Sequence, residues 1–134
     1  MGKTRRQVAR EKAVIGIYQH LVVDASLEEI EAYTLTSKTL SNDEPSFQFC
    51  KDLIEATLLH MDQYREEISK HLKKGWKINR LSYMEQAILL VAACEILEFD
   101  IDKRIVINEA VLIAKEYCDE DSYKFINGVL HSLI

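Results

Sequence analysis

The chain has 134 residues, 48% of them hydrophobic, and carries a formal net charge of −5. This length suffices for one domain with its own hydrophobic core, and the apolar fraction excludes an intrinsically disordered protein. The chain contains one proline and four glycines, and its apolar residues recur mostly at helical intervals. The sequence therefore predicts an all-α fold in a single domain, residues 1–134.

The first helix is predicted to begin after Thr4, with Gln7 as its capping partner, and to bury an apolar stripe that runs to Val22. Arg6 and Arg10 are four residues apart and therefore share a face of this helix. Positive charges on the first turns oppose the helix dipole, which favours anions there. This placement indicates either a site for an anionic ligand or a solvated face near the chain end.

Three further helices are predicted before the middle of the chain. A capping box of Ser26 and Glu29 opens a short one. Residues 34–45 are polar and rich in turn formers, so they are predicted to form a loop. Apolar spacing then predicts helices over residues 46–61 and 62–72.

The longest strongly apolar segment is Leu81–Phe99, which opens with a capping box of Ser82 and Glu85. Its apolar residues lie on nearly all sides of the helix, which is typical of a central helix with others packed around it. Asn108 is predicted to cap the next helix, and a last helix follows the acidic turn after Cys118. About seven helices result.

Positive charge is concentrated in two short stretches, although the chain as a whole is acidic. The N-terminal basic island consists of Lys3, Arg5, Arg6, Arg10 and Lys12. The second basic island consists of Lys70, Lys73, Lys74, Lys77 and Arg80, with no acidic residue between them. Such patches can attract an anionic partner such as a nucleic acid in spite of the negative total. Trp76 lies inside the second island, either as an exposed stacking platform or as an anchor of this connection to the core.

No pattern of catalytic or metal-binding residues stands out. Cys50, Cys94 and Cys118 are far apart and lie in or beside apolar helical runs, which indicates buried reduced thiols. The histidines lack zinc-ligand spacing, and no glycine-rich loop could hold a nucleotide phosphate. We therefore expect no catalytic residue, no metal and no cofactor. The N-terminus lacks the apolar region of a signal peptide, so the protein is predicted to be cytoplasmic, without a membrane partner.

Three blocks of the sequence together resemble the NusB family of bacterial transcription antitermination factors. They are RRxxAREKAxxxIYQ (5–19), WKINRLSYMEQAILLVAACEIL (76–97) and VINEAVLIAKEYCDEDSYKFINGVL (106–130). The resemblance extends from end to end, in the order and spacing of the family. It implies an all-α fold of two small helical bundles that share a long central helix.

The resemblance also implies a function and the residues that perform it. Proteins of this family pair with a small-subunit ribosomal protein, called NusE in this role. The pair binds the boxA element of nascent RNA and helps to assemble an antitermination complex on RNA polymerase. The residues expected to meet RNA are Lys3, Arg5, Arg6, Arg10, Asp121, Lys124 and Phe125. The residues expected to meet the ribosomal protein are Tyr18, Val22 and Glu85.

Some alternatives remain open at this point. Phe125 fits both a stacking platform for an unpaired base and the buried stripe of the last helix. We expect the Phe125 ring to be at least partly exposed and to lie beside the N-terminal basic helix. Gln7 interrupts the N-terminal basic island and the chain ends without a basic tail, so RNA affinity is expected to depend on the partner. A NusB-like domain also precedes some ribosomal-RNA cytosine methyltransferases. A third possibility is a non-catalytic protein–protein scaffold without RNA affinity of its own.

Overall fold

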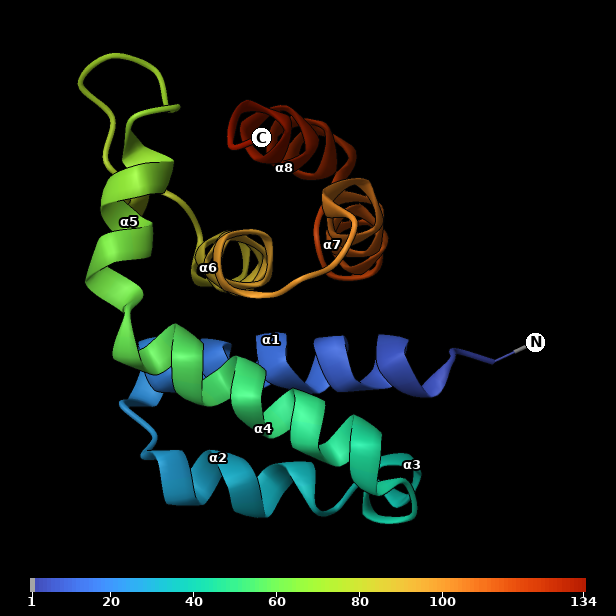
Figure 1. Cartoon of the computed structure of the whole chain (residues 1–134). Coiled ribbons are helices and arrows are strands. Elements are labelled where there is room, and N and C mark those ends of the chain that lie inside the picture. Colours follow the sequence, from blue (N-terminus) through green and yellow to red (C-terminus); the bar gives the residue numbers. More distant parts are fainter. Residues whose placement is uncertain (1) are drawn as a thin grey trace.

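The computed structural model describes residues 2–134, and these form eight α-helices and one short 3₁₀ helix, η1. The helices are α1 (Arg5–Val23), α2 (Leu27–Thr34), α3 (Lys38–Ser41), α4 (Glu44–Leu59), α5 (Met61–Ser69), η1 (Ile78–Arg80), α6 (Tyr83–Glu98), α7 (Lys103–Tyr117) and α8 (Glu120–Ser132). In Figure 1, helices α1 to α4 form one group, α6 to α8 form another, and α5 connects them. The prediction of an all-α fold with two helical bundles is confirmed.

Helix α6 is the element that both groups share. It packs against α1 and α4 on one side and against α7 and α8 on the other, and α5 also contacts it. All of its residues from Gln86 to Ile96 are buried, which is the burial expected of a helix without a polar face. Its capping box is present, because Ser82 accepts a hydrogen bond from the Glu85 backbone and Glu85 accepts one from the Ser82 backbone.

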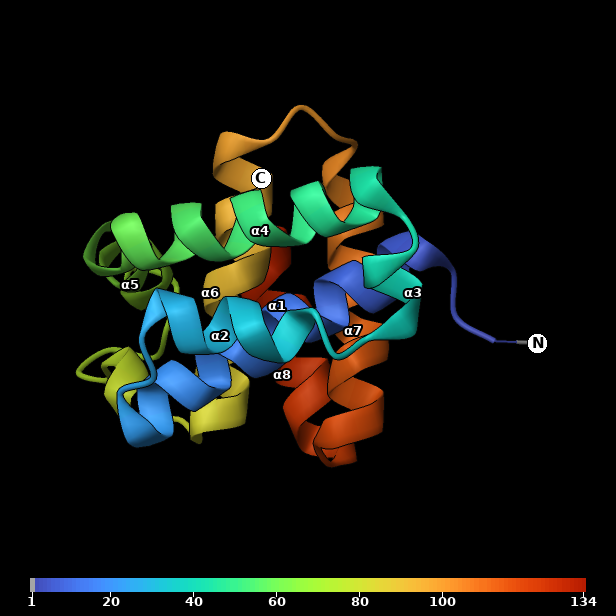
Figure 2. The same ribbon diagram turned by 90° about the horizontal axis from the view of Figure 1, so that it is seen from below.

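Helix α1 packs against α4 and α6, and in Figure 2 it runs obliquely across α6 and α7. The predicted capping box of Thr4 and Gln7 is present. Gly16 lies where α1 approaches α2 closely, because a Cβ atom there would come within 2.5 Å of an Ile30 methyl group. The helix therefore needs this glycine for its packing rather than for a turn.

Two details of the prediction are wrong. The segment predicted as a loop contains one helical turn, α3, capped by Ser37, and Leu40 within it is fully buried. This turn raises the number of helices from about seven to eight. Helix α7 begins at Lys103 with Asp102 as its cap, so Asn108 is an interior residue and not the predicted cap. Burial of Leu40 favours the α3 turn, and the Asp102 carboxylate accepts the Arg104 N–H at the start of α7. In each case this contact outweighed the local sequence pattern.

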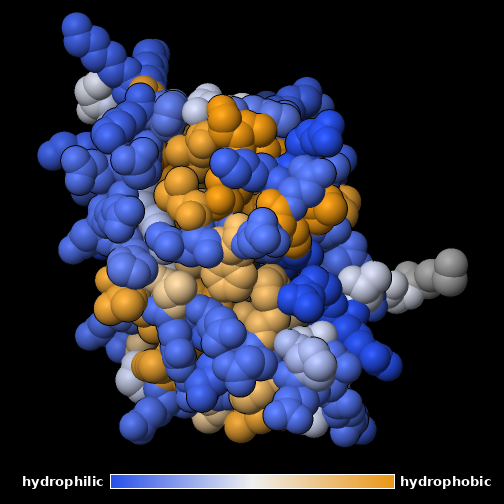
Figure 3. Space-filling view, in the orientation of Figure 1, coloured by the Kyte–Doolittle hydropathy of each residue, from blue (hydrophilic) through white to orange (hydrophobic). Residues whose placement is uncertain are grey.

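Some apolar surface remains exposed. Figure 3 shows hydrophobic side chains reaching the surface in a broad area over α6 and α8. Leu97 near the end of α6 and Ile134 after α8 are two of the exposed hydrophobic residues. Within residues 2–134, none of the helices combines the length and hydropathy that a membrane crossing requires.

Candidate nucleic-acid and partner interfaces

Lys3, which directly precedes the cap of α1, links α1 to α7. The Lys3 ammonium group donates hydrogen bonds to the carboxylates of Glu11 and Glu116, the latter at 2.8 Å. These bonds raise the pKa of Lys3 above its ordinary value. Burial alone would raise the pKa of Glu11, but the hydrogen bonds from Lys3 and Tyr117 lower it overall. Lys3 is thus a cation that already has two anionic partners within the protein.

Arg10 is not available to RNA, which corrects its prediction as an RNA contact. Its side chain is only 7% exposed and forms a bidentate ion pair with Glu95, with Nε–Oε1 and Nη2–Oε2 distances of 2.9 and 2.7 Å. The Glu95 side chain is 1% exposed, so the pair lies in the interior between α1 and α6. Arg6 and Arg10 share a face of α1, but α6 covers this face only at Arg10 and leaves it exposed at Arg6. The prediction failed because the sequence does not show where this cover begins.

Arg5 and Arg6 remain exposed at the start of α1. Arg5 contacts Asp43 at 3.3 Å, and its side chain is 72% exposed. The Arg6 guanidinium lies 4.1 Å from the ring centroid of Phe49. Because both arginines are themselves exposed to solvent, their contacts with Asp43 and Phe49 are weak, and they can exchange these partners for phosphates at little cost.

Phe125 lies half-buried in an open groove of about 310 Å³, which we call the Phe125 groove. Its lining residues are Trp76, Arg80, Leu81, Glu85, Asp119, Asp121, Ser122 and Phe125. The aromatic ring is therefore partly exposed, as expected, and Asp121 is beside it. However, the groove is lined by residues 76–85 and 119–125 rather than by α1, so Phe125 does not lie beside the N-terminal basic helix as predicted. Lys124 is exposed and pairs with Glu120 at 2.9 Å.

Trp76 and Arg80 are residues of this groove that the sequence did not assign to a site. The Arg80 guanidinium lies 5.0 Å from the Trp76 ring centroid, and the Trp76 residue is 38% exposed. Trp76 is thus closer to an exposed platform than to a core anchor. The basic island around it was a visible signal, but the sequence alone could not show that this island approaches the start of α8.

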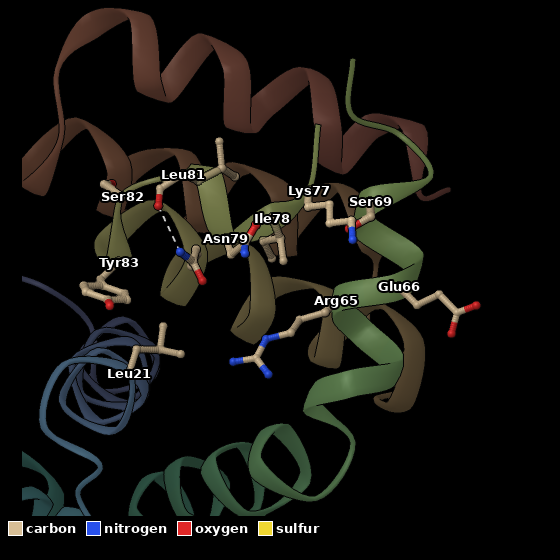
Figure 4. A pocket seen from close by; sticks show the side chains of 11 residues that line it. Leu21, Arg65, Glu66, Ser69, Lys77, Ile78, Asn79, Leu81, Ser82 and Tyr83 are labelled. Carbon is tan, nitrogen blue, oxygen red and sulfur yellow. Dashed lines mark hydrogen bonds between the residues drawn. The ribbon is translucent and has the colours of Figure 1, made fainter. Parts of the chain in front are cut away.

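A second groove, which we call the Tyr83 groove, has a volume of about 910 Å³. Figure 4 shows Leu21 from α1, Tyr83 from α6 and Arg65 from α5 around it. Leu21 directly precedes Val22, which is 44% exposed, and follows Tyr18 by one helical turn. Tyr18 is half-buried. Of the α1 residues, Leu21 lines this open concave surface, whereas the predicted partner residues Tyr18 and Val22 are its neighbours along the helix and do not line it.

The model of the NusB family matches residues 7–134. The chain belongs to the NusB family. A transcription antitermination protein NusB from Bacillus subtilis is 36% identical over 96% of this chain and 94% of its own length. One from Pediococcus pentosaceus is 35% identical over 99% of this chain and 98% of its own length.

Solved structures agree with this assignment. The fold is similar to a NusB chain in a crystal structure of the antitermination factors NusB and NusE in complex with double-stranded RNA. The TM-score is 0.85 at 25% identity, over 96% of this chain and 95% of that one. NusB of T. maritima gives a TM-score of 0.83 at 31% identity, over 99% of this chain and 92% of that one.

In this member of the NusB family the two grooves are neighbours. Leu81 lines both of them, and the residues of η1 and its flanks separate them. Glu85 lines the Phe125 groove and at the same time accepts the capping hydrogen bond from the Ser82 backbone, while Ser82 lines the Tyr83 groove. A ligand in one groove would therefore touch the same short segment as a ligand in the other.

The cysteines of this NusB family member are poor nucleophiles. All three are free; Cys50 and Cys94 are buried, and Cys118 is half-buried. Burial raises the pKa of Cys50 to about 12 and also raises the pKa of Cys94 and of Cys118. A thiol with a raised pKa carries little thiolate at neutral pH and is unreactive. Over residues 2–134, no cluster of three or more His, Cys, Asp and Glu side chains could hold a metal ion.

Proposed function

We propose that this protein is a cytoplasmic transcription antitermination factor that binds boxA-type single-stranded RNA together with a small-subunit ribosomal protein, NusE. In this role it helps to assemble an antitermination complex on RNA polymerase. The observation that carries the proposal is membership of the NusB family over residues 7–134. The structure adds a suitable groove for an unpaired base next to a suitable groove for a protein partner.

The Phe125 groove supplies what single-stranded RNA requires. An exposed part of an aromatic ring can stack on an unpaired base, and the Asp121 carboxylate can accept hydrogen bonds from the edge of that base. Lys124 is exposed on the same helix and can contact a phosphate. Arg5 and Arg6 are exposed cations for a more distant part of the RNA, whereas Lys3 would first have to release two carboxylates.

The edge of the Tyr83 groove is the proposed binding surface for the ribosomal protein. Tyr18 offers an aromatic face with a hydroxyl group, and Val22 offers exposed apolar area beside it. Glu85 would contact the partner from the neighbouring Phe125 groove. Because the two grooves adjoin at Leu81, partner and RNA can bind side by side, which explains why RNA affinity should depend on the partner.

The role is one of binding and assembly, so we assign no catalytic step to the chain. The curated relatives are named for antitermination, and the three cysteine thiols are buried or half-buried and have a raised pKa. The competing assignment, a protein–protein scaffold without RNA affinity, gains support from the internal ion pairs of Lys3 and Arg10. A binding measurement separates the two.

The test is a fluorescence-anisotropy titration of labelled boxA RNA with the protein, alone and with saturating NusE. We expect the partner to tighten RNA binding and Phe125→Ala to weaken it by about 1–3 kcal/mol, the range for one stacked base. Tyr18→Asp should abolish binding of NusE while it leaves the helical circular dichroism signal unchanged. Absence of RNA binding in the presence of bound NusE would instead favour the scaffold.

A further inference from the structure

The connection between α5 and α6, residues 70–82, exposes nearly all of its charge. Ile78 is 4% exposed and Leu72 is half-buried, so these two apolar side chains hold the connection against the helices. The residues of the second basic island, Lys70, Lys73, Lys74, Lys77 and Arg80, are all exposed. Anchoring by Ile78 and Leu72 therefore presents the basic side chains to solvent.

A tight turn joins two of these lysines to Trp76, a residue of the Phe125 groove. The backbone N–H of Trp76 donates to the carbonyl of Lys73 at 2.8 Å, and Gly75 has a φ of 83°. A left-handed residue at the third position is the mark of a type II turn, which glycine adopts without strain. Lys73 and Lys74 are thus within a single turn of Trp76, which lines the groove.

Lys73 and Lys74 of this turn, and Lys77 just after it, have no anionic partner within the described residues. Lys70 pairs with Glu67 at 3.0 Å, and Arg80 lies over Trp76. For Lys73, Lys74 and Lys77 the structure contains no carboxylate within 4.0 Å of the ammonium group, counted over residues 2–134. Their charge is therefore free for a ligand, and a phosphate would not have to displace a carboxylate.

Acidic and basic side chains lie on different sides of the Phe125 groove. Its acidic members, Glu85, Asp119 and Asp121, come from α6 and from the start of α8, whereas its basic member, Arg80, comes from the connection. Carboxylates repel phosphates but accept hydrogen bonds from base edges. A nucleotide in the groove is therefore most favourably placed with its base toward α8 and its phosphates toward the connection.

We propose that the turn formed by Lys73, Lys74, Gly75 and Trp76 binds the phosphate backbone of single-stranded RNA whose base stacks in the Phe125 groove. Trp76 with Arg80 forms one wall for the stacked base, and the two lysines contact the phosphates on either side of it. This inference rests on the proposed function, since it assumes that the Phe125 groove receives RNA. It makes the second basic island, rather than the N-terminal one, the main source of salt-dependent affinity.

The experiment measures RNA affinity against salt concentration for the Lys73→Gln/Lys74→Gln variant in complex with NusE. Each lost phosphate contact on single-stranded RNA flattens the plot of log K against log[salt] by about 0.7, so two lost contacts should flatten it by about 1.4. If the plots converge near 1 M salt, affinity at 0.1 M salt falls by about 25-fold. The matched control is Lys38→Gln/Lys103→Gln, which removes two exposed and unpaired lysines outside both grooves.

The outcomes separate this inference from the proposed function. A flattened slope for the Lys73→Gln/Lys74→Gln variant with a wild-type slope for the control supports the inference. An unchanged slope, while Phe125→Ala still weakens binding, overturns the inference and leaves the proposed function standing. Equal flattening of the slope in the control would mean that only the net charge of the protein matters, which overturns the inference. Loss of NusE binding without a change in the salt slope would assign the lysines to the protein partner and also overturns it. Absence of RNA binding by the wild-type complex overturns both.

Discussion

The two basic islands have the same number of positive charges but opposite surroundings. In the N-terminal island, Lys3 contacts Glu11 and Glu116, and Arg10 is buried against Glu95. In the second island, Lys73 and Lys74 extend from an exposed turn without a carboxylate nearby. A count of cations in a sequence therefore does not measure the charge that a ligand meets. What matters is how many of these cations the fold has already paired.

The pairing also divides the N-terminal island between two roles. Arg10 and Lys3 join α1 to α6 and α7 and therefore stabilise the fold. Arg5 and Arg6 stay at the surface with weak contacts to Asp43 and Phe49. Substitutions should thus reveal a steep gradient of stability effects within a single helix.

The largest effect is expected for Arg10→Gln. Removing one partner of a buried ion pair leaves Glu95 charged and uncompensated in the interior, which should lower the free energy of unfolding by about 3–5 kcal/mol. Urea denaturation followed by circular dichroism measures this difference. RNA binding by the folded fraction should keep the wild-type salt slope. A stable variant with a flattened slope would mean that Arg10 contacts RNA after all.

An intermediate effect, dependent on pH, is expected for Glu11→Gln. The pKa of Glu11 is lowered below its ordinary value of 4.5, so its ion pair with Lys3 stabilises the fold above that value and loses strength as the pH falls through the lowered pKa. At pH 7 the substitution should lower the free energy of unfolding by about 1 kcal/mol. The difference between wild type and variant should stay constant from pH 7 to pH 5 and shrink below pH 4.5. A difference that grows on acidification would contradict this account.

The smallest effect is expected for Arg5→Gln, because the Arg5 side chain is 72% exposed and its contact with Asp43 is solvated. The free energy of unfolding should change by less than about 0.5 kcal/mol, as for most exposed ion pairs. If RNA reaches the start of α1, the salt slope should still flatten by about 0.7. A loss of stability comparable to that of Arg10→Gln would remove the contrast between the two halves of the island.

Much of the fold was predictable because its signals are local. The capping boxes at Thr4, Ser26 and Ser82 depend only on residues three positions apart, and all three are present. The burial of α6 on all sides follows from its own composition. The α3 turn was missed because Leu40 is fully buried in the tertiary structure, a fact that a polar flanking sequence conceals.

The sequence by itself determined the helical class, the central helix and the family, because periodicity, capping residues and motif order are properties of the chain alone. Only the tertiary structure decided which cations are free, since Arg10 meets Glu95 across 85 positions of the chain and Lys3 meets Glu116 across 113. It also brought Trp76 and Arg80 to Phe125, in a groove that joins two segments distant in sequence. Electrostatic availability depends on distances through space, and these distances exist only once the helices have packed.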